Sequence, residues 1–415
     1  MSTSRLALPT DAVLDGRAFP LLLLLGVLLR LAALLAFPVF PLVGNTEDTA
    51  FYDEGARSLA KGQGYQWGGQ PTAFFPIGWP LILSLAYRIG GESARSGQMV
   101  NLLFSLAIVA GGWAMARGLL GARSGRFAAL VLALSPHQVV YPALLMSEPA
   151  FTALFIGSLA VLATMPTFSP GPVFASGARF VGAGLLMGAA TLVRGPALVF
   201  PLLAGAWARF GRKATPGASI VAALLFGLGL LLPVAPWAIR NHGVFDRWVL
   251  VANDGGMNFL MGNHAGATGA RHVPPGGLPD TGDEVADDRE GYRRGLQFIQ
   301  ARPLEFLSIL PRKLVRLTLP APLLTYRAEL RAKWPLPLAL GLLILDQLVH
   351  VALWGLALLA LIRRRHHPAV LFGSLAIGLW VVVHLAFLGG ARYFFPVMPI
   401  LVLLAAAGRF SERDS

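Results

Sequence analysis

Four arginines of this sequence stand beside long apolar runs, where a polar ligand and a membrane would meet. They are Arg88, Arg194, Arg240 and Arg392. Arginine binds phosphate through a planar fork of donors, and charges close to a membrane are costly and often mark function. A side chain that simply reaches out to lipid headgroups explains any one of them equally well. Three of them, Arg194, Arg240 and Arg392, are expected at similar depth on one membrane face, so a lipid phosphate is their natural partner.

Acidic residues gather directly after the first apolar run. Asp48 lies near the expected membrane plane, with Glu47 beside it, and a carboxylate there could act as a general base towards a lipid-borne substrate. Asp53 and Glu54 follow on the same expected helix. Because acids near a helix N-terminus suit its dipole, Asp53 and Glu54 favour a structural role.

A further acid, Glu148, occurs in Ser147-Glu148-Pro149, between the third and fourth apolar runs. It could bind the hydroxyl groups of a substrate. It could also belong to the start of a helix with Pro149 in the first turn, where proline is favoured. The sequence leaves both interpretations open.

The sequence offers no pattern for a resident metal or nucleotide. It has no cysteine, and its eight histidines include no helix-spaced pair of metal ligands. No glycine-rich loop follows a strand and opens a helix. We therefore expect no cofactor and no metal, although a divalent cation stays compatible with Glu47 and Asp48.

The composition excludes an ordinary soluble domain. Of the 415 residues, 55% are hydrophobic and 13% are charged, against roughly 25% charged in typical globular chains. The net charge of +13 would suggest nucleic acid in a soluble protein. Here most arginines lie between apolar runs, which indicates membrane topology and contact with anionic lipids instead. The first apolar run is too long for a cleaved signal peptide, so we expect it to remain as a span.

Ten apolar stretches have about the length of membrane spans. They cover residues 19–43, 98–116, 127–141, 149–165, 180–193, 196–208, 218–236, 338–362, 369–388 and 393–408. The fifth, sixth and tenth are short, so tilts, kinks or different boundaries are expected there. The predicted fold class is an all-α polytopic membrane protein with about ten transmembrane helices.

Lysine and arginine in the short loops predict the orientation. Three clusters, at residues 117–126, 209–213 and 363–365, fall on one side together with both termini, and that side is predicted to be cytoplasmic. Two long polar inserts then face outward. Residues 44–97 form the first outer loop, where we expect interfacial helices. Residues 237–337 form the second, which is too long for a simple connector.

Six segments, in this order, resemble the GT-C glycosyltransferases, and within them the bacterial branch related to protein mannosyltransferases and the lipid A aminoarabinose transferase. They are Asp48 to Tyr65, Pro71 to Pro80, Ser147 to Pro149, Thr191 to Pro196, a fifth made of Pro236 to Asn241 with Asn253-Asp254-Gly255 to Phe259 and Gly262-Asn263, and Arg392 to Pro396. Ile77 departs from the family's pattern, which usually has a second proline there. Each motif is loose alone, but six in family order over most of the chain are fairly specific.

The resemblance implies transfer of a sugar from a polyprenyl phosphate to a hydroxyl of a lipid, glycan or protein acceptor of the cell envelope, with inversion at the anomeric carbon. Asp48 matches the position of the family's catalytic base. The arginines would hold the phosphate leaving group, where charge develops. The substrate-binding residues that we expect are Glu47, Tyr52, Glu148, Arg194, Arg240, Asn241, Arg392 and Tyr393.

The resemblance also predicts where the protein works. We expect a single GT-C-like domain over residues 1–415 in the bacterial inner membrane, with its active site facing the periplasm or the cell exterior. Membrane lipids are expected partners and nucleic acid is not. Larger members of the family carry a soluble domain after the last span, and we expect none in this protein. Acceptor recognition is therefore expected in residues 237–337, which suggests a small or lipid-linked acceptor.

Two other functions remain open. A transporter or flippase of a lipid-linked sugar also needs many spans and charges within the membrane. Asp346 and His350, one helical turn apart in the eighth span, are the nearest pattern to a proton relay, and a structural pair explains them as well. A non-catalytic subunit of an envelope assembly is the second alternative.

Overall fold

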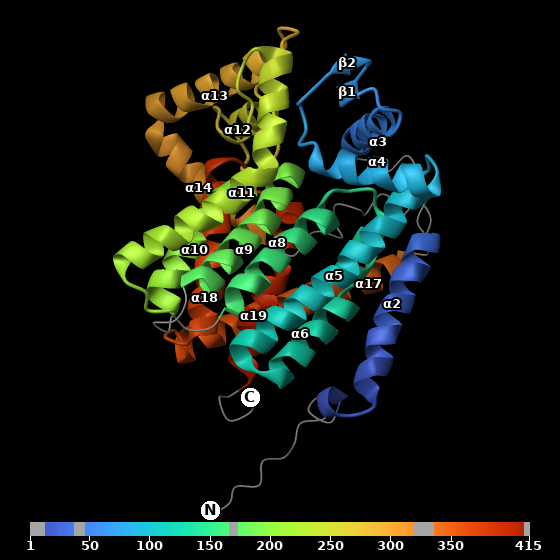
Figure 1. Cartoon of the computed structure of the whole chain (residues 1–415), viewed down its shortest axis with the longest axis vertical. Coiled ribbons are helices and arrows are strands. Elements are labelled where there is room, and N and C mark those ends of the chain that lie inside the picture. Colours follow the sequence, from blue (N-terminus) through green and yellow to red (C-terminus); the bar gives the residue numbers. More distant parts are fainter. Residues whose placement is uncertain (1–12, 37–45, 166–172, 319–335, 411–415) are drawn as a thin grey trace, which may run out of the picture.

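The computed structural model describes residues 13–36, 46–165, 173–318 and 336–410. Helices form nearly all the regular structure of this part of the chain, and the only paired strands there are the short β1 (Gln66–Trp67) and β2 (Gln70–Pro71). Figure 1 shows a bundle of long helices with shorter helices gathered at one end, which we call the insert end. The predicted all-α polytopic class is confirmed.

Long apolar helices make up the bundle. They are α2 (Ala18–Ala36), α5 (Ala94–Leu120), α6 (Ala122–Leu134), α8 (Glu148–Ala163), α9 (Val173–Val193), α11 (Pro216–Phe245), α17 (Leu336–Arg363), α18 (Pro368–Ala386) and α19 (Met398–Arg409). Within the described residues, six helical segments are long and apolar enough to cross a membrane, and two shorter apolar helices accompany them. The number of about ten spans stays a prediction.

Prolines break two of the predicted spans into shorter pieces. In place of one sixth span, the chain forms η2 (Gly195–Val199), α10 (Pro201–Ala206) and η3 (Trp207–Gly211). The third span ends as α6, and Pro136 begins α7 (Pro136–Val140), followed by η1 (Tyr141–Ala143). A proline cannot donate to the preceding turn, so helices restart at it rather than run through it.

Helix α11 behaves differently. We predicted that this span ends at Pro236, but the helix continues to Phe245 with Pro233 and Pro236 inside it. Beyond the prolines, the indole of Trp237 donates to the carbonyl of Val251 and the amide of Asn241 donates to that of Val249. These contacts fix the last turns of α11 against the chain that follows, which is how the helix outlasts its two prolines.

Both inserts lie at the insert end. The first contains α3 (Thr46–Ala60), β1, β2 and α4 (Gly78–Gly90), and the second contains α12 (Gly255–Gly262), α13 (Glu284–Ala301) and α14 (Pro303–Thr318). The turn between α5 and α6 and the end of α19 lie at the opposite end (Figure 1). This arrangement is the one that the loop charges predict, since both inserts fall on one side. That this side faces out of the cell stays a prediction.

A buried aromatic core supports the insert end from below. Trp380 on α18 packs against Phe151 and Phe155 on α8, with ring centroids 5.6 Å apart in each pair. The Trp380 indole also donates to the backbone carbonyl of Tyr393 at 2.9 Å. Tyr393 belongs to η4 (Ala391–Val397), the turn that leads into α19. The core therefore fixes the position of η4 relative to α8.

Candidate active site

Asp48 and Arg392 meet although 344 residues separate them in the sequence. Asp48 lies in the first turn of α3 and Arg392 lies in η4. The Nη1 of Arg392 donates to Oδ2 of Asp48 at 3.0 Å. Both side chains keep partial access to solvent, with 19% of Asp48 and 24% of Arg392 exposed. The pair is therefore neither a core contact nor a free surface salt bridge.

Glu148 lies between two arginines at the start of α8. Its Oε1 is 3.0 Å from Nη1 of Arg194 and 3.8 Å from Nε of Arg392. The same Nη1 of Arg194 donates to Oγ of Ser147 at 3.0 Å. The Glu148 side chain is 0% exposed, and within the described residues neither carboxylate oxygen accepts a hydrogen bond. A buried carboxylate with spare acceptor positions is uncommon in proteins and can receive donors from a ligand.

Tyrosine rings complete the cluster. The Tyr393 ring lies 5.6 Å from the guanidinium carbon of Arg194 and 5.2 Å from that of Arg392, within the range of a cation–π contact. Tyr52 lies one helical turn after Asp48 and is buried. Burial raises the pKa of the Tyr52 phenol, and the charge of Asp48 raises it further. We call Asp48, Glu148, Arg194, Arg392 and Tyr393 the arginine–carboxylate cluster.

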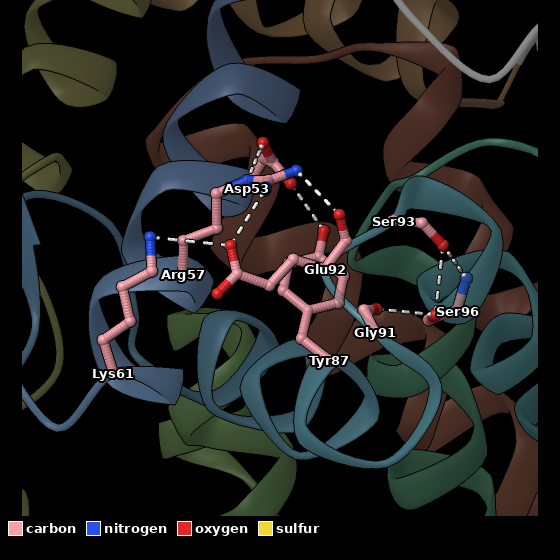
Figure 2. Close-up of polar contacts among 8 residues, drawn as sticks. All are labelled: Asp53, Arg57, Lys61, Tyr87, Gly91, Glu92, Ser93 and Ser96. Carbon is pink, nitrogen blue, oxygen red and sulfur yellow. Dashed lines mark hydrogen bonds and ion pairs between the residues drawn. The ribbon is translucent and has the colours of Figure 1, made fainter.

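Helix α3, which carries Asp48, is fixed on its other face by a polar network (Figure 2). Asp53 accepts hydrogen bonds from Arg57 at 2.9 Å and from the Tyr87 hydroxyl at 2.6 Å. Arg57 also donates to Glu92 at 3.0 Å, and Lys61 lies 3.6 Å from the same carboxylate. Asp53 therefore ties α3 to α4 through Tyr87, while Arg57 and Lys61 tie α3 to Glu92 just before α5, and this agrees with the structural role that the position of Asp53 favoured.

Aromatic side chains also hold α3 in place. Phe75 contacts both Phe51 and Tyr52, with ring centroids 4.8 Å and 5.5 Å away. The adjacent strand-like segment is held by Glu284, whose carboxylate accepts from the Thr72 hydroxyl and from the backbone N–H of Ala73, both at 2.7 Å. Glu284 begins α13. The second insert thus supports the helix that carries Asp48.

Gly78 brings α4 against the end of α9. A Cβ at this position would lie 2.6 Å from the carbonyl carbon of Leu192, closer than any side chain could stay. Only two residues later in the chain, Arg194 leaves the helix with extended backbone, φ −153° and ψ 122°. The glycine of the Pro76-Ile77-Gly78 segment is thus required for the packing that places Arg194.

Two of the four arginines do not join the cluster. Arg240 donates to the carbonyl oxygens of Thr72 at 3.0 Å and Tyr65 at 3.2 Å, and to the Oδ1 of Asn241 at 3.0 Å. Arg88 donates to the carbonyls of Leu59 and Ala60, the last residues of α3. Asn241 is buried beside Arg240. The structure therefore places Arg88 and Arg240 on the backbone of the first insert, and Asn241 on Arg240 and the carbonyl of Val249, apart from Asp48 and Arg392.

The backbone of Glu47 lies in the first turn of α3, but its side chain falls outside the part that the structure describes. Within the described residues, no group of three His, Asp or Glu side chains is arranged to hold a metal ion. Metal independence stays a prediction.

Asp346 and His350 have a third buried partner. The backbone N–H of His137 on α7 donates to Oδ1 of Asp346 at 3.1 Å. All three side chains line a cavity of about 10 Å³ together with Phe394, Phe395 and Met398. That volume holds about one water molecule. The arrangement is a small buried polar site beside η4, and it is too small to pass a lipid-linked sugar.

Asp254 is a group to which the sequence assigned no role. It precedes α12, where its Oδ2 accepts from the Asn258 amide at 3.0 Å. Burial raises the pKa of Asp254 to about 7, and the charge of Asp288 raises it as well. The charge of Arg194 lowers it and that of Asp48 raises it slightly, so Asp254 interacts electrostatically with the arginine–carboxylate cluster. Its only sequence signal was its place in the Asn253-Asp254-Gly255 segment.

Comparison with known proteins gives a family match over part of the chain and a similar fold over nearly all of it. Residues 75–239 match the family of dolichyl-phosphate-mannose-protein mannosyltransferases. That segment contains α4, α8 and α9, and therefore Glu148 and Arg194. No curated protein matches the sequence.

Solved structures resemble nearly the whole chain. ArnT from Cupriavidus metallidurans bound to undecaprenyl phosphate matches 94% of this chain with a TM-score of 0.56 and 17% identity. The oligosaccharyltransferase AglB from Archaeoglobus fulgidus, in complex with an inhibitory peptide and a dolichol-phosphate, matches 94% with a TM-score of 0.56 and 12% identity. Another structure of the Archaeoglobus fulgidus oligosaccharyltransferase, in complex with Zn and sulfate, matches 92% with a TM-score of 0.53 and 14% identity. This chain spans 61% of the length of ArnT and about half of the two oligosaccharyltransferase chains, 50% and 48%.

Proposed function

We propose that this chain, a GT-C superfamily protein related to the mannosyltransferases and to ArnT, is a membrane glycosyltransferase that uses a polyprenyl-phosphate-linked sugar. The acceptor would be a hydroxyl of an envelope lipid, glycan or protein on the outer face of the membrane. The observation that carries the proposal is the arginine–carboxylate cluster. It joins two arginines and two carboxylates from four distant segments of the chain at the insert end.

Arg194 and Arg392 would hold the phosphate of the donor. Their guanidinium groups both contact Glu148, so they lie close enough to share one anion. A phosphate leaving group gains negative charge as its bond to the sugar breaks, and fixed cations stabilise that charge best when they are partly shielded from water. The low exposure of both arginines, 13% and 24%, meets this requirement.

Asp48 would accept the proton of the attacking hydroxyl. The hydroxyl oxygen forms a bond to the anomeric carbon, the bond from that carbon to the phosphate oxygen breaks, and the proton passes to the Asp48 carboxylate. Attack from the side opposite the phosphate inverts the configuration. General-base assistance of this kind contributes typically 10²- to 10⁴-fold to a rate.

The pairing of Asp48 with Arg392 suggests how donor binding prepares the base. A phosphate that binds Arg392 competes with Asp48 for the same guanidinium. Oδ2 of Asp48, once released by that guanidinium, can accept a hydrogen bond from the acceptor hydroxyl. The donor would thereby activate Asp48 as it binds, before the acceptor reacts.

The remaining site residues take supporting roles in this proposal. Tyr393 orients both arginines through its ring, and Tyr52 borders Asp48 one turn along α3. Glu148, with unused acceptor positions, would bind a sugar hydroxyl. Arg240 would act on the substrate through the first insert, Asn241 would act through Arg240 and Val249, and Glu47 would lie beside the base.

Three wider features belong to the same proposal. The second outer loop, residues 237–337, would bind the acceptor, with Asp254 close enough to interact electrostatically with Arg194 and Asp48. The protein would lie in the bacterial inner membrane with the insert end outward. The reaction would need no metal, so added EDTA should leave the rate unchanged.

Mass analysis of envelope lipids and glycans tests the proposal. A strain that lacks this protein would be complemented with the wild type, Asp48→Asn or Asp53→Asn. The last variant is a matched control, because it makes the same change on the same helix in a residue that only anchors α3. We expect the deletion to lose one sugar residue, which the wild type and Asp53→Asn restore and Asp48→Asn does not.

Other outcomes would overturn different parts of the proposal. An unchanged glycan and lipid profile in the deletion strain would refute the transferase. A lipid-linked sugar that accumulates on the cytoplasmic side would favour the flippase. Full restoration by Asp48→Asn, at equal protein level, would remove Asp48 as the base while leaving the transferase in place.

A further inference from the structure

Lys313 is a buried cation that the proposed reaction does not use. It lies on α14, and none of its side chain is exposed. Among the described residues no carboxylate pairs with it. Its Nζ instead donates to Oδ1 of Asn263 at 2.8 Å and to the backbone carbonyl of Leu385 at 2.9 Å, and it lies 5.5 Å from the ring centroid of Phe306. Burial lowers the pKa of Lys313 to about 8, which shows that this placement opposes its charge.

Asn263 completes the contact from the second insert. Its Nδ2 donates to the carbonyl of Phe259 on α12 and to the carbonyl of Ala386, both at 2.8 Å. Asn263 is fully buried. Gly262-Asn263 was one of the segments singled out in the sequence, and no step of the proposed reaction accounts for it.

Lys313 and Asn263 together bind the C-terminal end of α18. The carbonyls of Leu385 and Ala386 are among the last of that helix, which have no partner within the helix. The C-terminus of a helix carries partial negative charge, so a lysine is favourable there. A side chain without a hydrogen-bond donor would leave the buried Leu385 carbonyl unpaired, at a typical cost of about 1–3 kcal/mol.

The chain that follows α18 is enclosed by the same two helices of the second insert. A Cβ on Gly389 would lie 2.2 Å from the carbonyl oxygen of Lys313, and a Cβ on Gly262 would lie 1.8 Å from that of Phe387. The N–H of Gly389 donates to the carbonyl of Gly269 at 2.8 Å. Three residues after Gly389, the chain reaches Arg392.

We propose that Lys313 and Asn263 are positioning residues, which hold residues 385–390 so that Arg392 stays aligned with Asp48 and Glu148. The second insert would then serve the reaction in two ways, by supporting α3 through Glu284 and by fixing η4 through this clamp. The alignment is a property of the fold, and only its purpose, holding a donor phosphate, rests on the proposed function.

A single engineered cysteine can report on the clamp, because the natural sequence contains none. Ala391→Cys places a thiol beside Arg392, and its reaction with a water-soluble maleimide is timed in purified protein in lipid nanodiscs. In this background Lys313→Met removes the donor while keeping an unbranched apolar side chain, and Asn263→Ala removes the second contact. Arg312→Met is the matched control, since Arg312 is the exposed neighbour on the same helix.

We expect Lys313→Met to speed labelling about tenfold, the change that corresponds to losing roughly 1.4 kcal/mol of local stability, with a smaller increase for Asn263→Ala. The double variant should add little, because both side chains act on the same carbonyl pair. Arg312→Met should label at the wild-type rate. If Lys313→Met does not fold, the labelling rate of Asn263→Ala alone shows whether the clamp exists. Wild-type labelling rates in the clamp variants that fold would overturn the proposal.

Binding of undecaprenyl phosphate, followed by native mass spectrometry on the proteins without the cysteine, separates the clamp from the proposed function. We expect Lys313→Met to bind it several-fold more weakly than Arg312→Met. Faster labelling with unchanged binding would overturn the positioning role. Absence of binding to the wild type itself would refute the proposed donor, and the labelling rates would still decide whether the clamp exists.

Discussion

Two regions of the molecule bury arginines, and they differ in what the guanidinium groups contact. In the bundle, Arg30 on α2 donates to the carbonyls of Gly26, Leu132 and Ala133 and to the Ser105 hydroxyl. Arg30 is 1% exposed. At the insert end, Arg392 instead donates to the Asp48 carboxylate and keeps 24% exposure.

The difference separates two uses of the same residue. Leu132 and Ala133 end α6, so Arg30 supplies donors to carbonyls that the helix itself leaves unpaired. Those acceptors are fixed backbone atoms, and replacing them by a ligand would expose a helix end in the membrane. Carboxylates can exchange a guanidinium for another cation or for water, so the Arg392 pair can open for an incoming anion. Arg240, bound to the carbonyls of Tyr65 and Thr72, belongs with Arg30 by this criterion.

The largest effect is expected from Arg392→Met. Removing one preorganised donor to a developing oxyanion typically costs 10²- to 10³-fold in rate, and we expect that loss in sugar transfer by the purified protein. Thermal unfolding should change little, because Asp48 can be hydrated at its exposed edge. Arg293→Met, which removes an exposed cation paired with Glu290, serves as the control. A loss below tenfold would place Arg392 among the structural arginines.

Arg30→Met should show the opposite profile. It leaves the carbonyls of Leu132 and Ala133 without donors, and we expect the free energy of unfolding to fall by about 2 kcal/mol. The protein that stays folded should bind undecaprenyl phosphate as tightly as the wild type. Thermal unfolding in detergent and native mass spectrometry measure the two quantities. Weaker phosphate binding at unchanged stability would contradict the comparison.

Arg240→Met tests whether Arg240 is a structural arginine like Arg30 or binds the donor phosphate like Arg392. If Arg240 only holds the hairpin of the first insert, transfer should slow less than tenfold and the unfolding free energy should fall by about 1 kcal/mol. If it binds the donor phosphate, as its place in the sequence suggested, the rate loss should equal that of Arg392→Met. Rates measured on the two variants in parallel decide between these uses.

Loop charge and apolar length were sufficient to predict the helical class, the common side of the two inserts and the positions of most long helices. They predicted a span that passes through Pro233 but ends at Pro236, because the continuation of α11 to Phe245 depends on Trp237 and Asn241 finding acceptors fourteen and eight residues later. They also missed the break at Pro136 and did not locate the break at Pro201 inside the short sixth span. A local sequence pattern indicates that a helix tends to end at a proline, and tertiary contacts decide whether it does.

The candidate site shows the same division. The types and order of Asp48, Glu148, Arg194 and Arg392 could be read from the sequence, since charges are rare beside apolar runs. The separation of Arg240 from these residues could not be predicted from the sequence, because Arg194, Arg240 and Arg392 are all expected at a similar depth in the membrane. Lys313 gave no signal and Asp254 gave only its place in the Asn253-Asp254-Gly255 segment, because both lie in a polar insert where charged residues are ordinary. Only the folded chain shows that Lys313 is fully buried and that Asp254 interacts electrostatically with the arginine–carboxylate cluster.

The smallest predicted effect concerns Asp254. It tests whether the charge of Asp254 interacts with the charges of the arginine–carboxylate cluster. Burial raises its pKa to about 7, while an aspartate in the unfolded chain titrates near 4. The folded protein therefore binds the proton more tightly, and this contribution to stability is present below pH 4 and is lost as the pH rises through about 7. The melting temperature should fall from pH 5 to pH 8 by less in Asp254→Asn than in the wild type. In the single variant Arg194→Met, the loss of stability should occur at higher pH, because the charge of Arg194 lowers the pKa of Asp254. Identical pH profiles in all three proteins would show that Asp254 is independent of the arginine–carboxylate cluster, and would leave it a structural residue at the start of α12.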